Sequence, residues 1–159
     1  MDALCDALSL DSLRVLHVRH EFGSPFAWTP QRWIELFHRC RAVEHVHIAH
    51  TAVPFIVALG LPILRSSPSE HDIEDGPESP RLFLENLQSL TLKHVNLEAR
   101  LPKKAKTACE SIVQRLAVRK QLKALPTIRV SADCLIGPES KEALEAVADV
   151  VQWLPEPED

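Results

Sequence analysis

The histidines of this chain recur at a spacing that could bring their side chains together. His17 and His47 lie 30 residues apart, as do His20 and His50, and His94 takes the position of His20 and His50 in a third segment. Imidazole is a common zinc ligand, and its charge changes near physiological pH. This spacing therefore favours either a zinc site or a pH-sensitive contact surface. A structural zinc site needs four ligands, and no cysteine or carboxylate is placed to complete one, so we expect no bound metal.

Signatures of catalysis are missing from the sequence. It has no Gly-x-Ser-x-Gly segment, and its four glycines do not form a loop that could cradle a phosphate or a dinucleotide. We therefore expect that the chain is not an enzyme, has no catalytic residues, and takes neither a cofactor nor a small-molecule substrate.

Two of these histidines, His17 and His47, belong to a repeated apolar pattern. Four segments read apolar-x-x-apolar-x-apolar, and they begin at Leu13, Val43, Leu87 and Leu125. Successive side chains of a strand point to opposite faces, so the pattern predicts strands near residues 13–18, 43–48, 87–92 and 125–130, each with one buried and one open face. The residues expected on the buried face are Leu16, Val18, Val46, Ile48, Leu90, Leu92, Ile128 and Val130.

Helices are predicted between the strands. Thr29 can cap a helix that begins at Pro30, and a short helix is expected over residues 53–59. Pro138 opens the last helix. The apolar side chains expected to face the core are Trp33, Ile34, Phe37 and Cys40 in the first helix, Ala105, Ala108, Cys109, Ile112 and Leu116 in the third, and Leu144, Val147 and Val151 in the last. Parallel strands need such crossovers, so we expect one α/β domain over residues 1–159.

The alternation of strand and helix resembles the leucine-rich repeat fold, a solenoid with parallel strands on its concave face and helices on its convex face. An ordinary α/β domain with a parallel sheet is the alternative, but its strands usually read as continuous apolar runs. Residues 13–18, 87–95 and 147–153 look like the degenerate leucine-rich region of fungal F-box proteins, and the resemblance covers about residues 10–153. It implies a surface that recognises the substrate of a ubiquitin ligase. The repeats begin near Leu13, so we expect the F-box itself to be lacking.

The open face of the predicted strands is the expected binding surface. It is polar and basic and has no aromatic anchor, so the partner should be a protein with an acidic or hydrogen-bonding surface. The residues expected to contact the partner are His17, Arg19, His45, His47, Thr91, Lys93 and Arg129.

Two other functions stay open. Residues 93–130 contain ten Lys or Arg residues against Glu98 and Glu110, which could serve nucleic-acid binding. That stretch has no aromatic residue on which a base could stack. Alternatively, the chain is a truncated fragment with no independent role.

Other features concern the ends, the loops and the compartment. Residues 65–81 are acidic and rich in proline and predict a flexible loop, in which Ser67 and Ser79 precede prolines and could be phosphorylated. Residues 154–159 should be a frayed tail. No apolar run is long enough to span a membrane, and we expect no membrane partner. The start lacks a signal peptide and the four cysteines are widely spaced, so we expect reduced thiols in the cytoplasm or nucleus.

Overall fold

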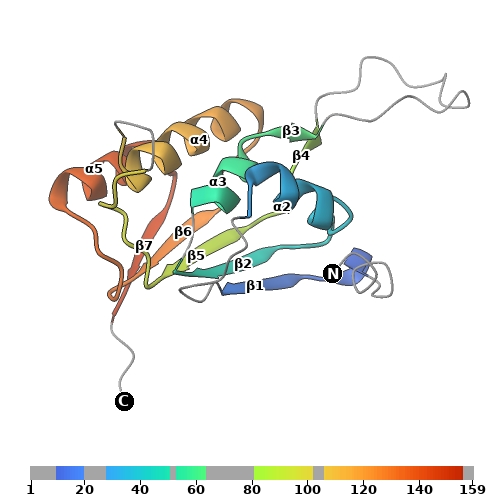
Figure 1. Ribbon diagram of the computed structural model, residues 1–159, viewed down its shortest axis with the longest axis horizontal. Coiled ribbons are helices and arrows are strands. Elements are labelled where there is room, and N and C mark those ends of the chain that lie inside the picture. Colours follow the sequence, from blue (N-terminus) through green and yellow to red (C-terminus); the bar gives the residue numbers. More distant parts are fainter. Residues whose placement is uncertain (1–9, 20–27, 51–52, 64–80, 102–105, 156–159) are drawn as a thin grey trace, which may run out of the picture.

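A parallel sheet covered by helices on one face forms the body of the molecule (Figure 1). The structure is a computed structural model that describes residues 10–19, 28–50, 53–63, 81–101 and 106–155. The sheet contains β1 (Val15–Arg19), β2 (His45–Ala49), β5 (Ser89–Lys93), β6 (Thr127–Ser131) and β7 (Val151–Leu154). The helices are α2 (Pro30–Phe37), α3 (Val53–Leu59), α4 (Ala108–Leu122) and α5 (Pro138–Val147), with a short 3-10 turn η1 (Leu10–Ser12) before β1. A small antiparallel pair joins β3 (Pro62–Ile63) to β4 (Arg81–Leu82).

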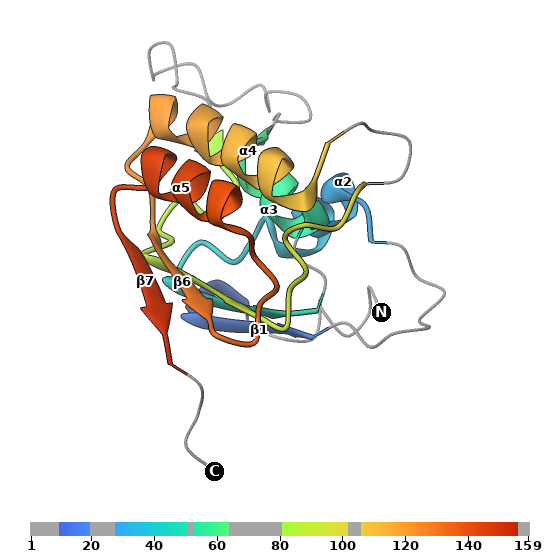
Figure 2. The same cartoon turned by 90° about the vertical axis from the view of Figure 1, so that its left-hand side faces the viewer.

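The strands of the large sheet lie in the order in which the chain makes them, β1-β2-β5-β6-β7. Neighbouring strands are parallel and align without offset between equivalent positions, so that Leu16, Val46, Leu90 and Ile128 form one line across the sheet. All four helices lie on the same side of the sheet, as the turned view in Figure 2 shows. The chain is thus a mixed α/β protein whose other sheet face is left without a helix, among the residues that the structure describes.

The predicted strand faces are confirmed, but the strands begin two residues later than the pattern suggested. The first apolar residue of each motif packs against the core from outside the strand, as Val43 and Leu87 show by being buried. Residues three apart in a strand point to opposite faces. Because the first and second apolar residues both point inward, the extended chain must begin between them.

Most of the core is built from the residues that the pattern placed there. Leu90 and Leu92 in the central strand are fully buried, and so is Leu144 of α5. The prediction for Val151 is wrong: this residue is not on the last helix but in a fifth strand, opposite Ile128. The helix ends at Val147 because Ala148 is already extended.

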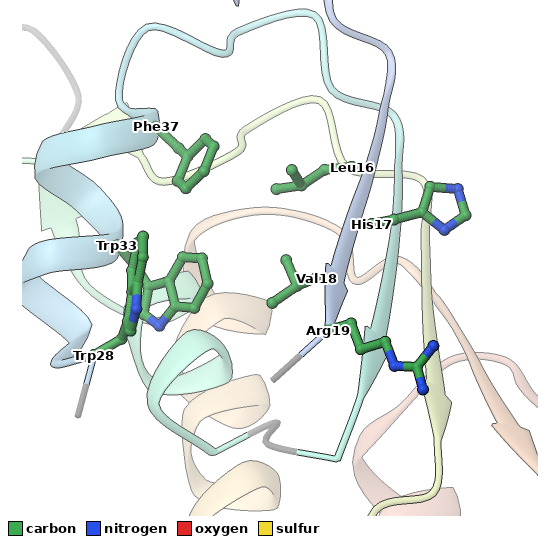
Figure 3. Close-up of a pocket in the computed structure, with 7 residues that line it drawn as sticks. All are labelled: Leu16, His17, Val18, Arg19, Trp28, Trp33 and Phe37. Atoms are coloured by element: carbon green, nitrogen blue, oxygen red, sulfur yellow. The ribbon is translucent and has the colours of Figure 1, made fainter. Parts of the chain in front are cut away.

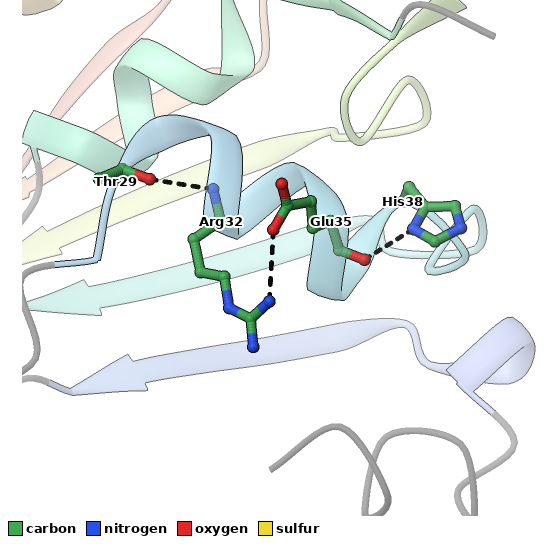
Figure 4. A network of polar contacts seen from close by, with 4 residues as sticks. All are labelled: Thr29, Arg32, Glu35 and His38. Atoms are coloured by element: carbon green, nitrogen blue, oxygen red, sulfur yellow. Dashed lines mark hydrogen bonds and ion pairs between the residues drawn. The ribbon is translucent and has the colours of Figure 1, made fainter. Parts of the chain in front are cut away.

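Capping interactions fix where α2 and α4 begin. The hydroxyl of Thr29 accepts a hydrogen bond of 3.2 Å from the Arg32 N–H, as predicted, and Arg32 pairs with Glu35 (Figure 4). At the other end of α2, His38 Nδ1 donates to the Glu35 carbonyl. Thr107 and Glu110 form a reciprocal capping box at α4. Ala105, which the pattern assigned to this helix, lies outside the described residues.

Helix α5 has a cap borrowed from a distant part of the chain. Its N-cap residue is Gly137, which has no side chain to accept from the helix. Glu98 takes this role: its Oε1 accepts the Gly137 N–H at 2.8 Å. The hydrogen bonds of this carboxylate with Ser140 and with the Gly137 N–H lower the pKa of Glu98. The loop after β5 is therefore tied to the start of α5.

Arg119 joins three segments in the core. Its guanidinium is fully buried and donates to the carbonyls of Leu59 (3.0 Å), Phe83 (2.8 Å) and Leu84 (2.7 Å). The first carbonyl ends α3, and the other two belong to the turn after β4, where Leu84 has a φ of 48°. Burial lowers the pKa of Arg119 to about 10, so the side chain stays charged at neutral pH. This arginine holds α4, α3 and the turn together.

Several expectations fall partly on residues without a description. Residues 64–80, most of the predicted loop, lie outside the described ranges, as do residues 156–159. At their edges the structure corrects the prediction, because Arg81 belongs to β4 and Leu154 to β7. Of the helices that are described, none has both the length and the apolar character to cross a membrane.

Candidate binding face

The sheet surface opposite the helices carries the predicted contact residues. We call it the open face, and it consists of the strand residues that alternate with the core positions: Val15, His17, Arg19, His45, His47, Ala49, Ser89, Thr91, Lys93, Thr127, Arg129, Ser131, Gln152 and Leu154. These residues include Arg19, Lys93, Arg129 and three histidines, but no Asp or Glu. The open face is therefore a basic surface, and it becomes more so as histidines take up protons.

One row of residues crosses the middle of the open face. His17 lies beside His47, then come Thr91, Arg129 and Gln152 in register. The rings of His17 and His47 stack with centroids 4.5 Å apart and planes at 4°, as their equal spacing in the sequence predicted. Arg129 is held in place by a hydrogen bond of 2.9 Å from its Nε to Gln152 Oε1.

His45 belongs to a different row of the open face from the His17–His47 pair. Its side chain lies on the open face, two residues before His47 in β2, and its neighbours on the adjacent strands are Val15 and Ser89. Its Nδ1 forms a hydrogen bond of 2.8 Å with Ser89 Oγ. The ring is thereby fixed toward β5 rather than toward His17.

Thr91 is not exposed, which corrects the prediction. Only 2% of its surface is accessible to solvent, and its hydroxyl oxygen has no hydrogen-bond partner in the described part of the chain. The central position of β5 explains this burial, because the longer side chains of His47 and Arg129 flank the threonine on both sides. A partner could reach this hydroxyl only if one of those side chains moved aside.

His47 is harder to protonate than an ordinary histidine. Burial against its neighbours lowers its pKa below 6.5, and the positive charges of His17, Lys93, Arg129 and His45 lower it further. The strand pairing that stacks the two rings thus also buries His47 in part and brings cations from β5 and β6 close to it.

A second pair of stacked histidines lies where the strands end. His50 and His94 directly follow β2 and β5, and both have left-handed backbones, with φ of 71° and 51°. Their rings stack at 5.1 Å. Asp133 accepts the His94 N–H at 2.9 Å and lies 3.2 Å from His94 Nδ1. The equivalence of His50 and His94 is visible in the sequence, whereas His20, the third member, lies outside the described residues.

No cluster of three or more His, Cys, Asp or Glu side chains is arranged to hold a metal ion in the described ranges. In the described ranges, the stacked histidine pairs therefore lack the further ligands that a metal site would need. Cys40, Cys109 and Cys134 are buried, and burial raises the pKa of the Cys109 and Cys134 thiols, which makes these two poor nucleophiles at neutral pH.

The basic stretch from residue 93 to residue 130 does not form one surface. Lys93 and Arg129 lie on the open face, Arg119 is in the core, and Lys120 on α4 pairs with Asp149 at 2.7 Å. Lys103 and Lys104 lie outside the described residues. The basic residues that can be placed are thus divided between two sides of the molecule.

Comparison with protein-family models, with curated proteins and with solved structures finds no match for this chain.

Proposed function

We propose that this chain is a non-enzymatic protein-interaction module whose open face binds an acidic or hydrogen-bonding protein surface. The observation that carries the proposal is the charge of this face: its strand residues include Arg19, Lys93 and Arg129 and no carboxylate. Complementary charge steers such partners to the surface and disfavours basic ones.

The architecture that goes with this proposal is a short solenoid of the leucine-rich-repeat kind, resembling the substrate-recognition repeats of F-box proteins. Three features support it: the strand order equals the chain order, equivalent positions align across the sheet, and the helices lie on one side (Figure 2). An ordinary parallel sheet in an α/β domain has helices on both faces. A sheet left open on one face is the arrangement that repeat proteins use for binding.

The contact residues differ in how they can act. Arg129 is held by Gln152, so its guanidinium is positioned before a partner arrives, while Lys93 and Arg19 are exposed and adaptable. His17 is exposed and stacks on the less accessible His47. No Trp, Tyr or Phe lies on the open face. Interfaces draw much of their affinity from buried aromatic and arginine side chains, so the affinity should be modest.

Nucleic acid is the second candidate, because the chain carries many basic residues between positions 93 and 130. The division of these residues between the open face and the α4 side makes a single phosphate-binding track hard to build. The salt dependence of binding separates the two candidates, since each phosphate contact adds close to one unit to the slope of log K against log salt.

The test uses a glutamate homopolymer as the acidic probe and a DNA duplex as the competing one. Reversing the charge of Lys93 and Arg129 together should weaken binding of the acidic probe by about tenfold or more. Lys106 and Lys123, which are exposed and lie on the α4 side, provide the matched double reversal, which should change affinity by less than about twofold. Equal losses in both variants, or tighter binding of DNA with a steep salt slope, would overturn the proposal.

A further inference from the structure

In the part of the chain that the structure describes, strand β1 forms an edge of the sheet, and one of its sides has no partner strand. It pairs with β2, and within the described ranges no other strand lies against it. Glu44 and His45 both donate their N–H to the Arg14 carbonyl. The backbone N–H and C=O groups of successive residues point to opposite sides of a strand. The backbone groups of Leu16 and Val18 therefore also point toward β2. Those of Val15, His17 and Arg19 point outward, away from β2. Such an edge is a template for a further strand.

An apolar cavity opens at this same edge. It has a volume of about 200 Å³ and lies between β1 and α2 (Figure 3). Leu16 and Val18 line it from β1, and Trp28, Trp33 and Phe37 line it from the other side. The rings of Trp28 and Trp33 are 4.4 Å apart. An apolar cavity of roughly 150 Å³ can hold a benzene molecule, so this one has room for a large apolar side chain.

The opposite side of β1 has a different chemistry. His17 and Arg19 also border the cavity. Their side chains, however, point away from the tryptophans, toward the open face, as Figure 3 shows. A strand added beside β1 would place alternate side chains on these two sides. One set would enter the apolar cavity, and the other would lie beside His17 and Arg19.

We propose that the free edge of β1 binds an extended segment of another protein in which apolar and acidic residues alternate. The apolar side chains enter the cavity beside Trp28 and Trp33, the acidic ones approach Arg19 and His17, and the main chains form a ladder. A second copy of this chain fits less well, because its own β1 would bring His17 and Arg19 to the same basic side. This site shares His17 and Arg19 with the proposed function, but its backbone ladder and its apolar cavity do not depend on Lys93 or Arg129 at the centre of the open face.

The other edge of the sheet does not offer the same site. In β7 the core-side residue Trp153 is covered by α5, with the Lys141 Nζ 4.4 Å from the ring centroid and the indole N–H bonded to Glu145 at 2.8 Å. The space behind this strand is therefore filled by the chain itself. Trp153 supplies a matched control for the tryptophans behind β1.

The experiment uses a blocked peptide of about eight residues, a common strand length, in which leucine and glutamate alternate. Binding is followed by amide chemical shifts of residues 15–19. Two modified peptides carry N-methyl groups on all leucine amides or on all glutamate amides. Only one set of amides can face β1, so one modification should weaken binding by about tenfold or more and the other by less than about twofold. Equal affinities of the two modified peptides would overturn the proposal.

Side-chain changes in the peptide and in the protein test the cavity and the charge. Replacing leucine by alanine in the peptide, or glutamate by lysine, should each weaken binding by about tenfold. In the protein, Trp28→Ala should weaken binding similarly, with thermal unfolding as the check of folding, while Trp153→Ala should not. If binding tolerates the alanine peptide and Trp28→Ala, the cavity is not the site.

The double charge reversal at Lys93 and Arg129 separates this edge site from the proposed function. It removes charge from β5 and β6, away from β1, and should change peptide affinity by less than about threefold. A tenfold loss in that variant would place the peptide on the centre of the open face and overturn the edge site. Failure of the glutamate homopolymer to bind the open face would leave the peptide result unaffected.

Discussion

A single buried side chain, Arg119, shows how much of this fold depends on one residue. Its guanidinium has no carboxylate within bonding distance in the described residues and is held by carbonyls of Leu59, Phe83 and Leu84. A hydrogen bond to a charged group contributes about 1.5–3 kcal/mol, and a buried carbonyl left unpaired carries a penalty of its own.

We predict that Arg119→Met lowers the free energy of unfolding by roughly 3 kcal/mol or more, because three carbonyls lose their donor. Chemical denaturation measures the change. Gln121→Met, an exposed position on the same helix, is the control and should stay within about 0.5 kcal/mol of the wild type. A loss below about 1 kcal/mol in Arg119→Met would mean that water or the backbone replaces the guanidinium.

The pKa of His47 provides the second prediction at this scale. Its folded pKa lies below the ordinary 6.5, whereas the unfolded chain titrates at the ordinary value. Unfolded protein therefore binds more protons, and the free energy of unfolding should fall as pH falls from 6.5 through the folded pKa. Imidazole proton chemical shifts measure this pKa directly. Arg129→Gln should raise it by removing one of the cations.

His47 also shifts the pH range in which an acidic partner should bind more tightly. Strengthening that depends on His47 should appear below pH 6.5, because the pKa of His47 lies below this ordinary value. A variant with His47→Gln should lose this part of the pH dependence and keep the rest. A His47 resonance that titrates at or above 6.5 would contradict the argument.

At the scale of elements, alternation made the strand faces predictable. Leu90 and Leu92 point into the core and Lys93 follows on the surface, as two-residue periodicity requires. The stacked His17–His47 pair could be predicted for the same reason, because equal positions in aligned strands are neighbours. Strand β7 could not be predicted, because its sequence Val-Gln-Trp-Leu continues the apolar spacing of α5. Only its pairing with β6 distinguishes it from a further turn of that helix.

The burial of Thr91 and the role of Arg119 could not be predicted from the sequence, for a related reason. Each depends on which side chains arrive from other elements: His47 and Arg129 beside the threonine, α3 and the turn after β4 around the arginine. In the sequence, Arg119 is one more cation in a basic stretch. Its neighbours in space are 35 to 60 residues away along the chain.

The central strand gives the clearest test of the sheet. Leu90 is fully buried in β5, between β2 and β6, so Leu90→Ala should lower the free energy of unfolding by roughly 2–5 kcal/mol. Val15→Ala on the exposed side of β1 is the control, with an expected effect within about 0.5 kcal/mol. Similar small effects at both positions would mean that the register is displaced by one residue.

At the scale of the whole molecule, the sheet is built from two halves of the chain. Residues up to 63 supply β1, β2, α2 and α3. Residues from 81 onward supply β5, β6 and β7 together with α4 and α5. The halves meet along the β2–β5 ladder, where five residue pairs are in register, and α3 packs against α4. Arg119 of the second half also donates a hydrogen bond to Leu59 of the first half, and β3 of the first half pairs with β4 of the second.

We therefore predict that cutting the chain inside residues 65–81 leaves the two halves associated. The test inserts a site for a specific protease there and compares gel filtration before and after complete cleavage. The cut protein should elute with the intact chain and separate only in denaturant, since the β2–β5 ladder and the buried leucines on both sides do not pass through the cut. Arg119→Met should make the cut protein separate at lower denaturant, because this side chain bonds to both halves. Dissociation on cleavage without denaturant would show that covalent connection, rather than this interface, holds the sheet together.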